Sequence, residues 1–515
     1  MSDPQIYNCQ ATHLTDIPRL SLPEFRSRVI RDVAAGARIS ALFGCPARAL
    51  LAPQESDSHS DAIRLFAVLS RAHTGDFAVF CADAEEHYPS LTPECVQAHW
   101  FEREIAEQWG LKPEGHPWLK PIRFHASYRA GRDAWRRSSY DEILPSVMNF
   151  FRVKGAEVHE VAVGPVHAGV IEPGHFRFQC HGENVLHLEI SLGYQHRGVE
   201  RALIGGPCAR TIHLMETLAG DTSCGHATAY CQAVEALAGA RVPARAQAWR
   251  GIALELERLA NHSGDLGALA GDIGYLPTAS YCGRLRGDFL NMTALLCGSR
   301  FGRSLIRPGG VCFDVGAADI DRLRERLRSA LRDVTSAATL LWKTPSVMAR
   351  FEETGRISRK DCEALGLVGL VARACGVERD ARFEFPSGIF QFAHIPISVW
   401  QTGDVLARAY IRWLEIQRSA AFIEEQLKDM PESEITTVVD ALAPQSLVVS
   451  LVEGWRGEIC HVALTDANGH FAHYKVVDTS FHNWMGLALA MRDQPISDFP
   501  LCNKSFNLSY CGHDL

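Results

Sequence analysis

The chain has 515 residues, of which 47% are hydrophobic and 22% charged, a composition that predicts a globular protein of two or three domains. A formal net charge of -8 excludes an overall basic surface of the kind that binds nucleic acid. The 16 cysteines are scattered without any C-x-x-C pair, which favours free thiols in a reducing cytosol over a secreted disulfide scaffold. We expect no signal peptide and no transmembrane helix, because the sequence shows neither a basic, apolar leader nor a long apolar run.

The first part of the chain, to about residue 150, begins with short apolar runs. Residues 39–45 and 77–80 are typical of buried strands, and residues 61–70 fit either a helix or a long strand. The region from about residue 125 to 155 is polar and basic, which indicates a linker.

One helix is well marked in this first part. It is expected to begin at Thr92, a favourable N-cap that is followed by Pro93, and to end at Gly110. Its residues 102–104 are Glu, Arg and Glu, and composition alone favours a solvated charged face for them.

The rest of the chain alternates strands with long helices. Alternation of polar and apolar residues predicts strands within residues 157–194 and 446–477. Apolar residues at helical spacing predict helices that cover residues 248–265, 319–341, 402–428 and 483–492. On the first of these helices, Arg258 shares a face with His262, and Asn261 shares a face with Asp265.

Several motifs, taken in order, resemble known protein families. Tyr-Pro-Ser-Leu at 88–91, Glu-Arg-Glu at 102–104 and Gly-His-Pro at 115–117 resemble the C subunit of NADH-quinone oxidoreductase, the respiratory complex I. From residue 157 the chain resembles the D subunit of that complex. It resembles still more the large subunit of energy-converting nickel–iron hydrogenases of the formate hydrogenlyase type, in which the two units are also fused. The stretches that carry this resemblance include residues 164–167, 172–177, 257–262 and 453–458.

The resemblance implies an α+β fold. It implies an α/β domain like the complex I C subunit at residues 1–125 and a linker at residues 126–156. A mainly helical domain with small β-sheets, like the complex I D subunit and the hydrogenase large subunit, is expected at residues 157–515.

The hydrogenases hold nickel and iron with two C-x-x-C pairs, because thiolates suit soft transition metals. Glu216 and His226 match the two ends of the first metal-binding motif, and the last residues of the chain overlay on the second. The four ligand positions then fall on Ala219, Thr222, Ser509 and Gly512. None of these is a cysteine, so we expect no metal site and no nickel–iron centre. The sequence stops three residues after Gly512, where the hydrogenases carry a tail that is removed during nickel insertion, so we expect no such processing.

In complex I, a loop histidine and a helix tyrosine contact the quinone. His167 matches the first loop histidine of the family, while Glu172 or His175 could stand in for the second, and Gly220 falls at the tyrosine position. We therefore predict a remodelled cavity in which His167, Glu172 and His226 transfer protons, since imidazole titrates near neutral pH. Further lining residues of this cavity are expected to be Thr222, Ser509 and Cys511.

The resemblance implies a cytoplasmic subunit that partner subunits hold at the inner face of the cell membrane. These partners would be a small iron–sulfur subunit with a 4Fe–4S cluster and the membrane subunits. The chain itself is expected to carry no cofactor, although a quinone could bind. Two alternatives stay open, a non-catalytic structural subunit and an active hydrogenase large subunit. A structural or interface role is expected for Arg258, His262, Asp265, Arg373 and Asp404.

Overall fold

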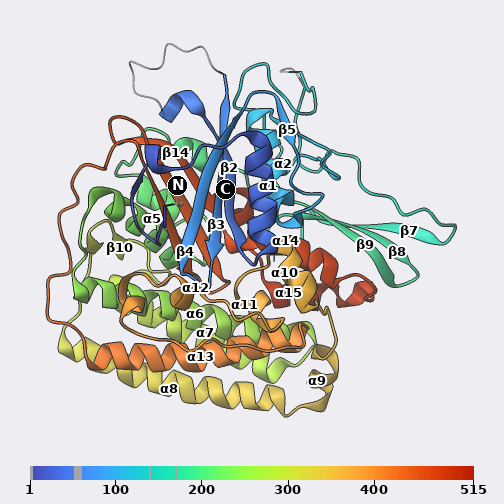
Figure 1. The fold of residues 1–515 in the computed structure, drawn as a ribbon. Coiled ribbons are helices and arrows are strands. Elements are labelled where there is room, and N and C mark those ends of the chain that lie inside the picture. The colour runs from blue at the N-terminus through green and yellow to red at the C-terminus, as the bar shows by residue number, and fades with distance from the viewer. Residues whose placement is uncertain (1–3, 51–60, 139–140, 169–170) are drawn as a thin grey trace.

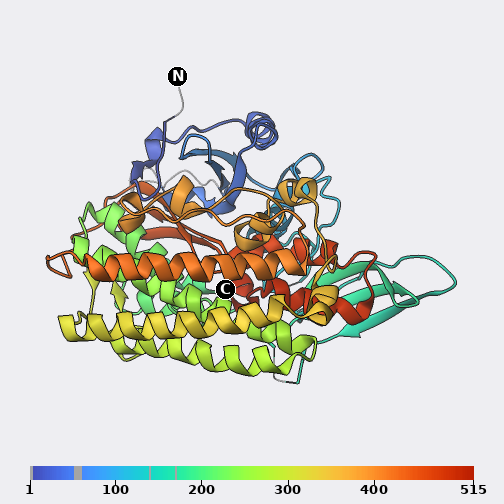
Figure 2. The ribbon, with the colours of Figure 1, turned by 90° about the horizontal axis from the view of Figure 1, so that it is seen from below.

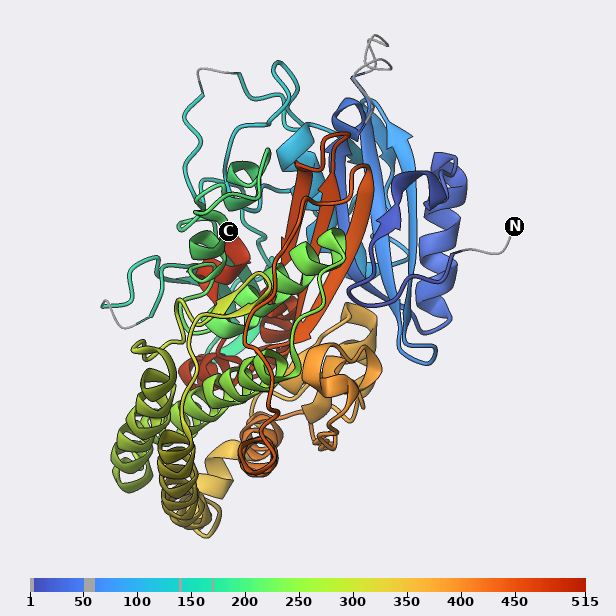
Figure 3. The ribbon, with the colours of Figure 1, turned by 90° about the vertical axis from the view of Figure 1, so that its left-hand side faces the viewer.

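The computed structural model describes residues 4–50, 61–138, 141–168 and 171–515. The fold is of the α+β class, as predicted, with two antiparallel sheets packed beside each other and a layer of long helices next to them (Figures 1 and 3). No helix among these residues combines the length and the apolar character that a membrane span requires.

The first sheet joins β2 (Arg38–Pro46), β3 (Ile63–Arg71) and β4 (Asp76–Ala84) in antiparallel order. Nearly all residues of these strands are buried, because both faces of the sheet are covered. The helix α1 (Leu22–Ala34) packs on one face and begins with a capping box between Ser21 and Glu24. The sequence of residues 61–70 fitted either a helix or a long strand, and the structure shows that this segment forms the strand β3.

The second sheet has the order β1-β12-β13-β14. Its three long strands, β12 (Ser446–Glu453), β13 (Glu458–Thr465) and β14 (Phe471–Val477), are buried along their whole length. The short β1 (Thr12–His13) pairs with β12, so the start of the chain extends a sheet built from its end. Figure 3 shows this sheet in red beside the blue sheet of β2, β3 and β4.

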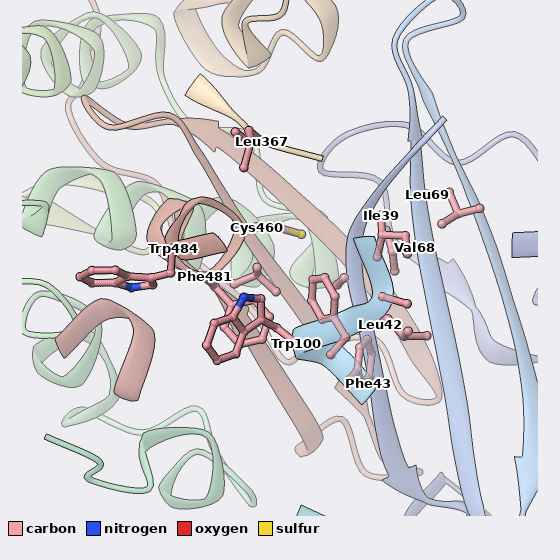
Figure 4. Close-up of a cluster of buried hydrophobic side chains, with 14 of the residues drawn as sticks. Ile39, Leu42, Phe43, Val68, Leu69, Trp100, Leu367, Cys460, Phe481 and Trp484 are labelled. Carbon is pink, nitrogen blue, oxygen red and sulfur yellow. The ribbon is translucent and has the colours of Figure 1, made fainter. Parts of the chain in front are cut away.

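The helix α2 (His99–Trp109) lies between these layers and ends at Gly110, which adopts a left-handed φ of 62°. The helix begins later than predicted. Thr92 does not cap it, because the Thr92 hydroxyl donates a hydrogen bond of 2.6 Å to Glu102. The expectation of a solvated face at residues 102–104 is wrong, since all three side chains are buried, with at most 4% exposure. Figure 4 shows Trp100 of the same helix in a cluster of buried side chains that includes Phe43 of β2, Cys460 of β13 and Phe481 of α14 (Thr479–Ala490).

The long helices form a layer on one side of the second sheet (Figure 2). The helix α5 (Ser223–Ala238) packs directly on β12 and β13. The predicted helices at 248–265, 319–341 and 402–428 are confirmed, and a further helix that the sequence pattern did not reveal lies beside the first. Their bounds are α6 (Ala244–Asp272), α7 (Leu276–Cys297), α8 (Ala317–Trp342) and α13 (Val405–Lys428).

A third sheet projects from the body of the molecule on the right of Figure 1. It consists of β7 (Val158–Val163), β8 (His175–His181) and β9 (Asn184–Ser191), and β9 contacts α14. Short elements complete the fold: β5 (His87–Pro89), β6 (Lys112–Glu114), β10 (Ile306–Arg307), β11 (Gly310–Val311), α3 (Val199–Ala202), α4 (Thr211–Met215), α9 (Pro345–Phe351), α10 (Arg359–Leu365), α11 (Gly369–Ala374), α12 (Ala381–Glu384), α15 (Phe499–Phe506) and α16 (Tyr510–Asp514).

Candidate functional site

The two segments that the sequence overlay matched to the halves of a hydrogenase metal site meet in the structure. Arg456, in the turn between β12 and β13, donates two hydrogen bonds of 2.7 Å to Asp221 and one of 2.5 Å to the carbonyl oxygen of Asn507. Arg197 donates to the carbonyl oxygens of Leu218 and Cys511, at 3.1 and 3.4 Å. Two arginines thus tie the start of α5 to the C-terminal helices.

None of the four expected ligand positions offers a free metal-binding group, since two carry hydroxyls that accept hydrogen bonds within the protein and two carry no polar side chain. The Thr222 hydroxyl oxygen accepts hydrogen bonds of 3.1 Å from Trp455 Nε1 and from Arg456 Nη1. The Ser509 hydroxyl oxygen accepts from the amide of Gly512 at 2.9 Å and so caps α16. Ala219 is fully buried and offers a methyl group. A methyl, two hydroxyls and a hydrogen atom do not match the four thiolates that a nickel–iron centre needs.

The cysteines near these positions hold their protons tightly. Burial raises the pKa of Cys511 to about 11, with the nearby Glu172 carboxylate adding to the shift. Burial also raises the pKa of Cys502 to about 11 and moves the pKa of Cys224 well above its usual range. A thiol binds a metal as the thiolate, so these three residues are poor substitutes for the missing ligands. Among the described residues, no group of three or more His, Cys, Asp or Glu is arranged to hold a metal ion.

His226 is the centre of a buried chain of hydrogen bonds. Its Nε2 lies 3.1 Å from Oδ2 of Asp478, and its Nδ1 lies 3.1 Å from Nε2 of His461. The chain ends at Tyr474, whose hydroxyl lies 2.9 Å from Nδ1 of His461. All four side chains are at most 2% exposed.

When His226 is neutral, one set of proton positions satisfies this chain. Burial alone would raise the pKa of Asp478, but the hydrogen bond from His226, the charge that His226 carries when protonated and the charge of Arg456 lower it to about 2, so Asp478 is a carboxylate. The carboxylate accepts from His226 Nε2, which leaves His226 Nδ1 to accept from His461 Nε2. His461 Nδ1 then accepts from the Tyr474 hydroxyl. All donors point toward Asp478, as in a proton relay.

Asp478 also touches the second half of the site. A Cβ atom placed on Gly512 would lie 2.8 Å from the carboxyl carbon of Asp478 and 3.0 Å from the Ser509 hydroxyl oxygen. Only a glycine fits there without displacing a neighbour. The chain of hydrogen bonds from Tyr474 therefore ends against Gly512, one of the four positions at which the sequence overlay expected a metal ligand.

Glu172 lies on the other side of Ser509 and Gly512. Its Oε2 accepts hydrogen bonds of 2.7 Å from the Cys511 amide and from Gln195 Nε2. A cavity of about 270 Å³ opens beside it, with Glu172, Asp221, Arg456, Asn503, Lys504 and Tyr510 in its wall. Of the six residues predicted to line this cavity, only Glu172 is in the wall. Thr222, Ser509, Cys511 and His226 lie behind it, in contact with wall residues or in the relay.

His167 is placed apart from the relay. Its Nε2 lies 2.9 Å from the carbonyl oxygen of Gly174, and its ring lies beside Phe176. No hydrogen bond joins it to His226 or Glu172 in the described part of the chain. His175, the other candidate in this loop, lies 3.3 Å from the Gly164 carbonyl oxygen and accepts from Arg177. Glu172 is thus the residue of this loop that reaches the site.

The five residues with an expected structural role are buried. Arg258, His262 and Arg373 all hydrogen-bond the carboxylate of Glu415, which joins α6, α11 and α13. Two further residues stand outside this cluster. Asp265 accepts from Arg412 at 2.7 Å and from Asn507 at 2.6 Å, and Asp404 caps the start of α13.

Sequence reasoning missed Asp478, His461, Tyr474 and Arg456. His461 and Tyr474 lie on neighbouring strands, and only the pairing register of β13 with β14 brings their side chains together. Asp478 gave a weak signal, because an Asp between a strand and a helix is a favourable N-cap, and its Oδ1 does accept from the Ser480 amide.

Comparison with known proteins agrees with this architecture. Residues 40–138 match the family of the 30 Kd subunit of respiratory-chain NADH dehydrogenase, and residues 272–446 match the family of its 49 Kd subunit. Formate hydrogenlyase subunit 5 of Escherichia coli is 28% identical over 438 residues, which cover 82% of this chain and 76% of that protein. The carbon monoxide-induced hydrogenase of Rhodospirillum rubrum is 30% identical over 352 residues, 68% of this chain and 97% of that protein.

The name of a third relative joins the two subunit letters C and D. The C/D subunit of NADH-quinone oxidoreductase from Bdellovibrio bacteriovorus is 27% identical over 349 residues, 66% of this chain and 62% of that protein. The chain belongs to the family that unites the fused 30 Kd and 49 Kd subunits of respiratory NADH dehydrogenase with the related subunits of energy-converting hydrogenases.

Proposed function

We propose that this chain is a subunit of a membrane-associated oxidoreductase of the complex I type, in which a proton-transfer site has replaced the nickel–iron centre. The observation that carries the proposal is the relay Tyr474–His461–His226–Asp478, which ends at the former ligand position Gly512. A hydrogenase needs thiolates there, and this chain has none at the four positions.

Ser509 and Gly512 separate the relay from the cavity, since a Cβ atom on Gly512 would lie close to both Asp478 and the Ser509 hydroxyl, and the Cys511 amide donates to Glu172 in the cavity wall. Glu172 would exchange protons with a molecule in the cavity. Resupply of these protons from His226 would need a bridging water, because no hydrogen bond among the described residues joins Asp478 to Ser509. The buried His461 and Tyr474 would fix the orientation of the His226 ring.

A quinone is the acceptor that suits this cavity. Its carbonyl oxygens need hydrogen-bond donors, and the wall offers Lys504, Asn503 and Tyr510. A bound quinone would supply two-electron acceptor chemistry coupled to proton uptake. The electrons would come from a 4Fe–4S cluster on an iron–sulfur partner subunit, which would cover the loop around Val166, a residue that is 81% exposed. Membrane subunits would hold the assembly at the inner face of the cell membrane.

The experiment measures quinone-linked turnover of the assembled complex with His226→Gln and Glu172→Gln. Each is expected to lower turnover tenfold or more, because a positioned acid–base group contributes about 10²- to 10⁴-fold. His473→Gln is the matched control, since His473 is also buried on β14 but stacks on Phe43 of the other sheet. Unchanged turnover in both site variants, with the complex intact, would disprove the proton-transfer role.

A second candidate function is that of a non-catalytic subunit. The observation in its favour is that both ligand pairs are missing together while the buried cluster around Glu415 is complete. In that case the two site variants would assemble and turn over like the unmodified complex.

A further inference from the structure

A second and larger cavity, of about 730 Å³, lies between α2, β9 and α14. These three elements come together on the right-hand side of Figure 1, and Figure 4 shows Trp100 of α2 beside Phe481 of α14. The cavity shares no lining residue with the one at Glu172. Its volume is in the range of about 300–1,000 Å³ that is typical of small-molecule sites.

The wall of this cavity is mainly apolar and aromatic. Trp118 and Phe151 stack edge to face with ring centroids 5.4 Å apart, and Trp100 and Phe481 lie 6.4 Å apart. Leu188 of β9 and Met485 of α14 complete the apolar surface. Such a wall suits the body of an apolar molecule.

One cation in the wall has no anionic partner. Arg103 of α2 is 4% exposed, and its guanidinium carbon lies 4.7 Å from the centroid of the Trp100 ring. Its Nε and Nη2 donate to the carbonyl oxygens of Lys120 and Pro121, at 2.8 and 2.7 Å. Across the described ranges, no carboxylate lies within 4.0 Å of this guanidinium and Nη1 has no acceptor. Burial lowers the pKa of Arg103 to about 10, although the charges of Glu189 and Glu107 oppose the shift.

The nearest carboxylates are occupied by other donors. Glu189 pairs with Lys120 at 2.6 Å and accepts from Trp118 Nε1 and from the Phe151 amide, at 3.2 and 2.8 Å. Glu107 accepts from the backbone amides of Ile122, Arg123 and Phe124. Burying a charge without a close counter-ion costs free energy, and the fold has already removed most water from Arg103. An anionic ligand would therefore form a strong charge-assisted hydrogen bond to Arg103 without a further cost of dehydrating this side chain.

Two more observations show unpaired polar groups in the wall of this cavity. Arg492 lines its outer part, is exposed, and forms no ion pair with the described residues. Three lining residues also carry a buried ring nitrogen without a hydrogen-bond partner in the same part of the structure, namely His99 Nδ1, Trp100 Nε1 and His482 Nε2. The cavity therefore combines an apolar body with unpaired polar and cationic groups, and its one lining carboxylate among the described residues, Glu189, is already paired with Lys120.

We propose that this cavity binds a small amphipathic anion, with one carboxylate or phosphate at Arg103 and an apolar body against Trp100, Phe481 and Met485. A neutral apolar molecule would leave the Arg103 charge without a partner, and a cation would be repelled by it. A folded partner surface would not reach a guanidinium that is only 4% exposed. The site is independent of the proton-transfer proposal and would survive its failure.

The first experiment compares three probes of equal chain length by calorimetric titration of the purified full chain. Dodecanoate and dodecyl phosphate are expected to bind about tenfold or more tightly than dodecanol, which is worth about 1.4 kcal/mol. The tighter of the two anions tells whether the natural head group is a carboxylate or a phosphate. Anions that bind no better than dodecanol, or binding only to anionic vesicles, would overturn the proposal.

The second experiment uses variants of the wall. Arg103→Gln is expected to weaken dodecanoate about tenfold and to leave dodecanol unchanged. Arg129→Gln is the control, because Arg129 is also buried and bonded to backbone carbonyls but lies outside this cavity. Met485→Trp narrows the apolar part of the cavity and is expected to weaken binding of all three probes. If Arg103→Gln does not fold, full dodecanoate affinity in Met485→Trp would overturn the proposal by itself.

Discussion

His226 Nε2 donates a hydrogen bond of 3.1 Å to Asp478 Oδ2, and this bond joins α5 to the segment that leads into α14. Both side chains are buried, so the bond is shielded from water. A carboxylate acceptor makes this a charge-assisted hydrogen bond, at one end of a buried chain that includes His461 and Tyr474.

Asp478→Asn tests the charge of this acceptor through the pH dependence of stability. The folded-state pKa of Asp478 is about 2 and its ordinary value 3.8, so its ionised form stabilises the protein above pH 4 and this contribution is lost as the pH falls through about 2. The difference corresponds to about 2 kcal/mol at neutral pH. Urea unfolding of both proteins from pH 7 to pH 2 should show a gap of this size that narrows in acid. A gap that stays constant with pH would contradict the assignment.

Gly512→Ala tests the contact between the relay and the former ligand position. The new methyl group would meet the Asp478 carboxyl carbon at 2.8 Å, which forces a shift and is expected to cost about 1–3 kcal/mol of unfolding free energy. Gly283→Ala is the control, because Gly283 lies on α7 with no atom within 4 Å of the added group. It should stabilise the protein by about 0.5–1 kcal/mol. Equal effects of the two substitutions would argue against a packed contact.

Glu102→Gln tests the buried face of α2. Glu102 accepts four hydrogen bonds, from the hydroxyls of Ser90 and Thr92 and from the amides of Leu91 and Thr92. A Gln turns an amide donor toward these donors, and the expected loss is about 2–4 kcal/mol of unfolding free energy. Glu94→Gln, at a side chain that is 57% exposed, should change it by less than about 1 kcal/mol. Chemical denaturation of both variants measures the difference, and a loss as small as that of Glu94→Gln would contradict this burial.

Glu415→Gln tests the buried ion cluster. Removal of the Glu415 charge leaves Arg258 and Arg373 partly uncompensated, and a cost of about 3–5 kcal/mol is expected. The control is Glu424→Gln on the same helix, where the carboxylate is 29% exposed beside Arg324 and the expected cost is at most about 1 kcal/mol. Thermal unfolding of the two variants should differ clearly in midpoint, and similar midpoints would show that the cluster does not hold the helices.

The long helices were predictable from sequence, while the environment of α2 was not. A helix such as α8 exposes one face, so its apolar residues recur at helical spacing. The helix α2 is covered by two sheets, and the second is formed by residues far along the chain. Its charged residues Glu102, Arg103 and Glu104 therefore read as a solvated face.

The site shows the same limit. His226, Ser509 and Gly512 could be named as candidates because the motifs around them fix their place in the chain. Asp478 and His461 could not, because their approach to His226 depends on the register of β13 and β14 and on the packing of α5 across them. Local sequence carries none of that information.

We propose that this site holds no nickel–iron centre. Elemental analysis of the purified, assembled complex, together with hydrogen-dependent dye reduction, tests it most directly. The thiolate-free set Ala219, Thr222, Ser509 and Gly512 predicts nickel at background level and no hydrogen-dependent reduction. About one nickel per chain, with dye reduction by hydrogen, would contradict the account.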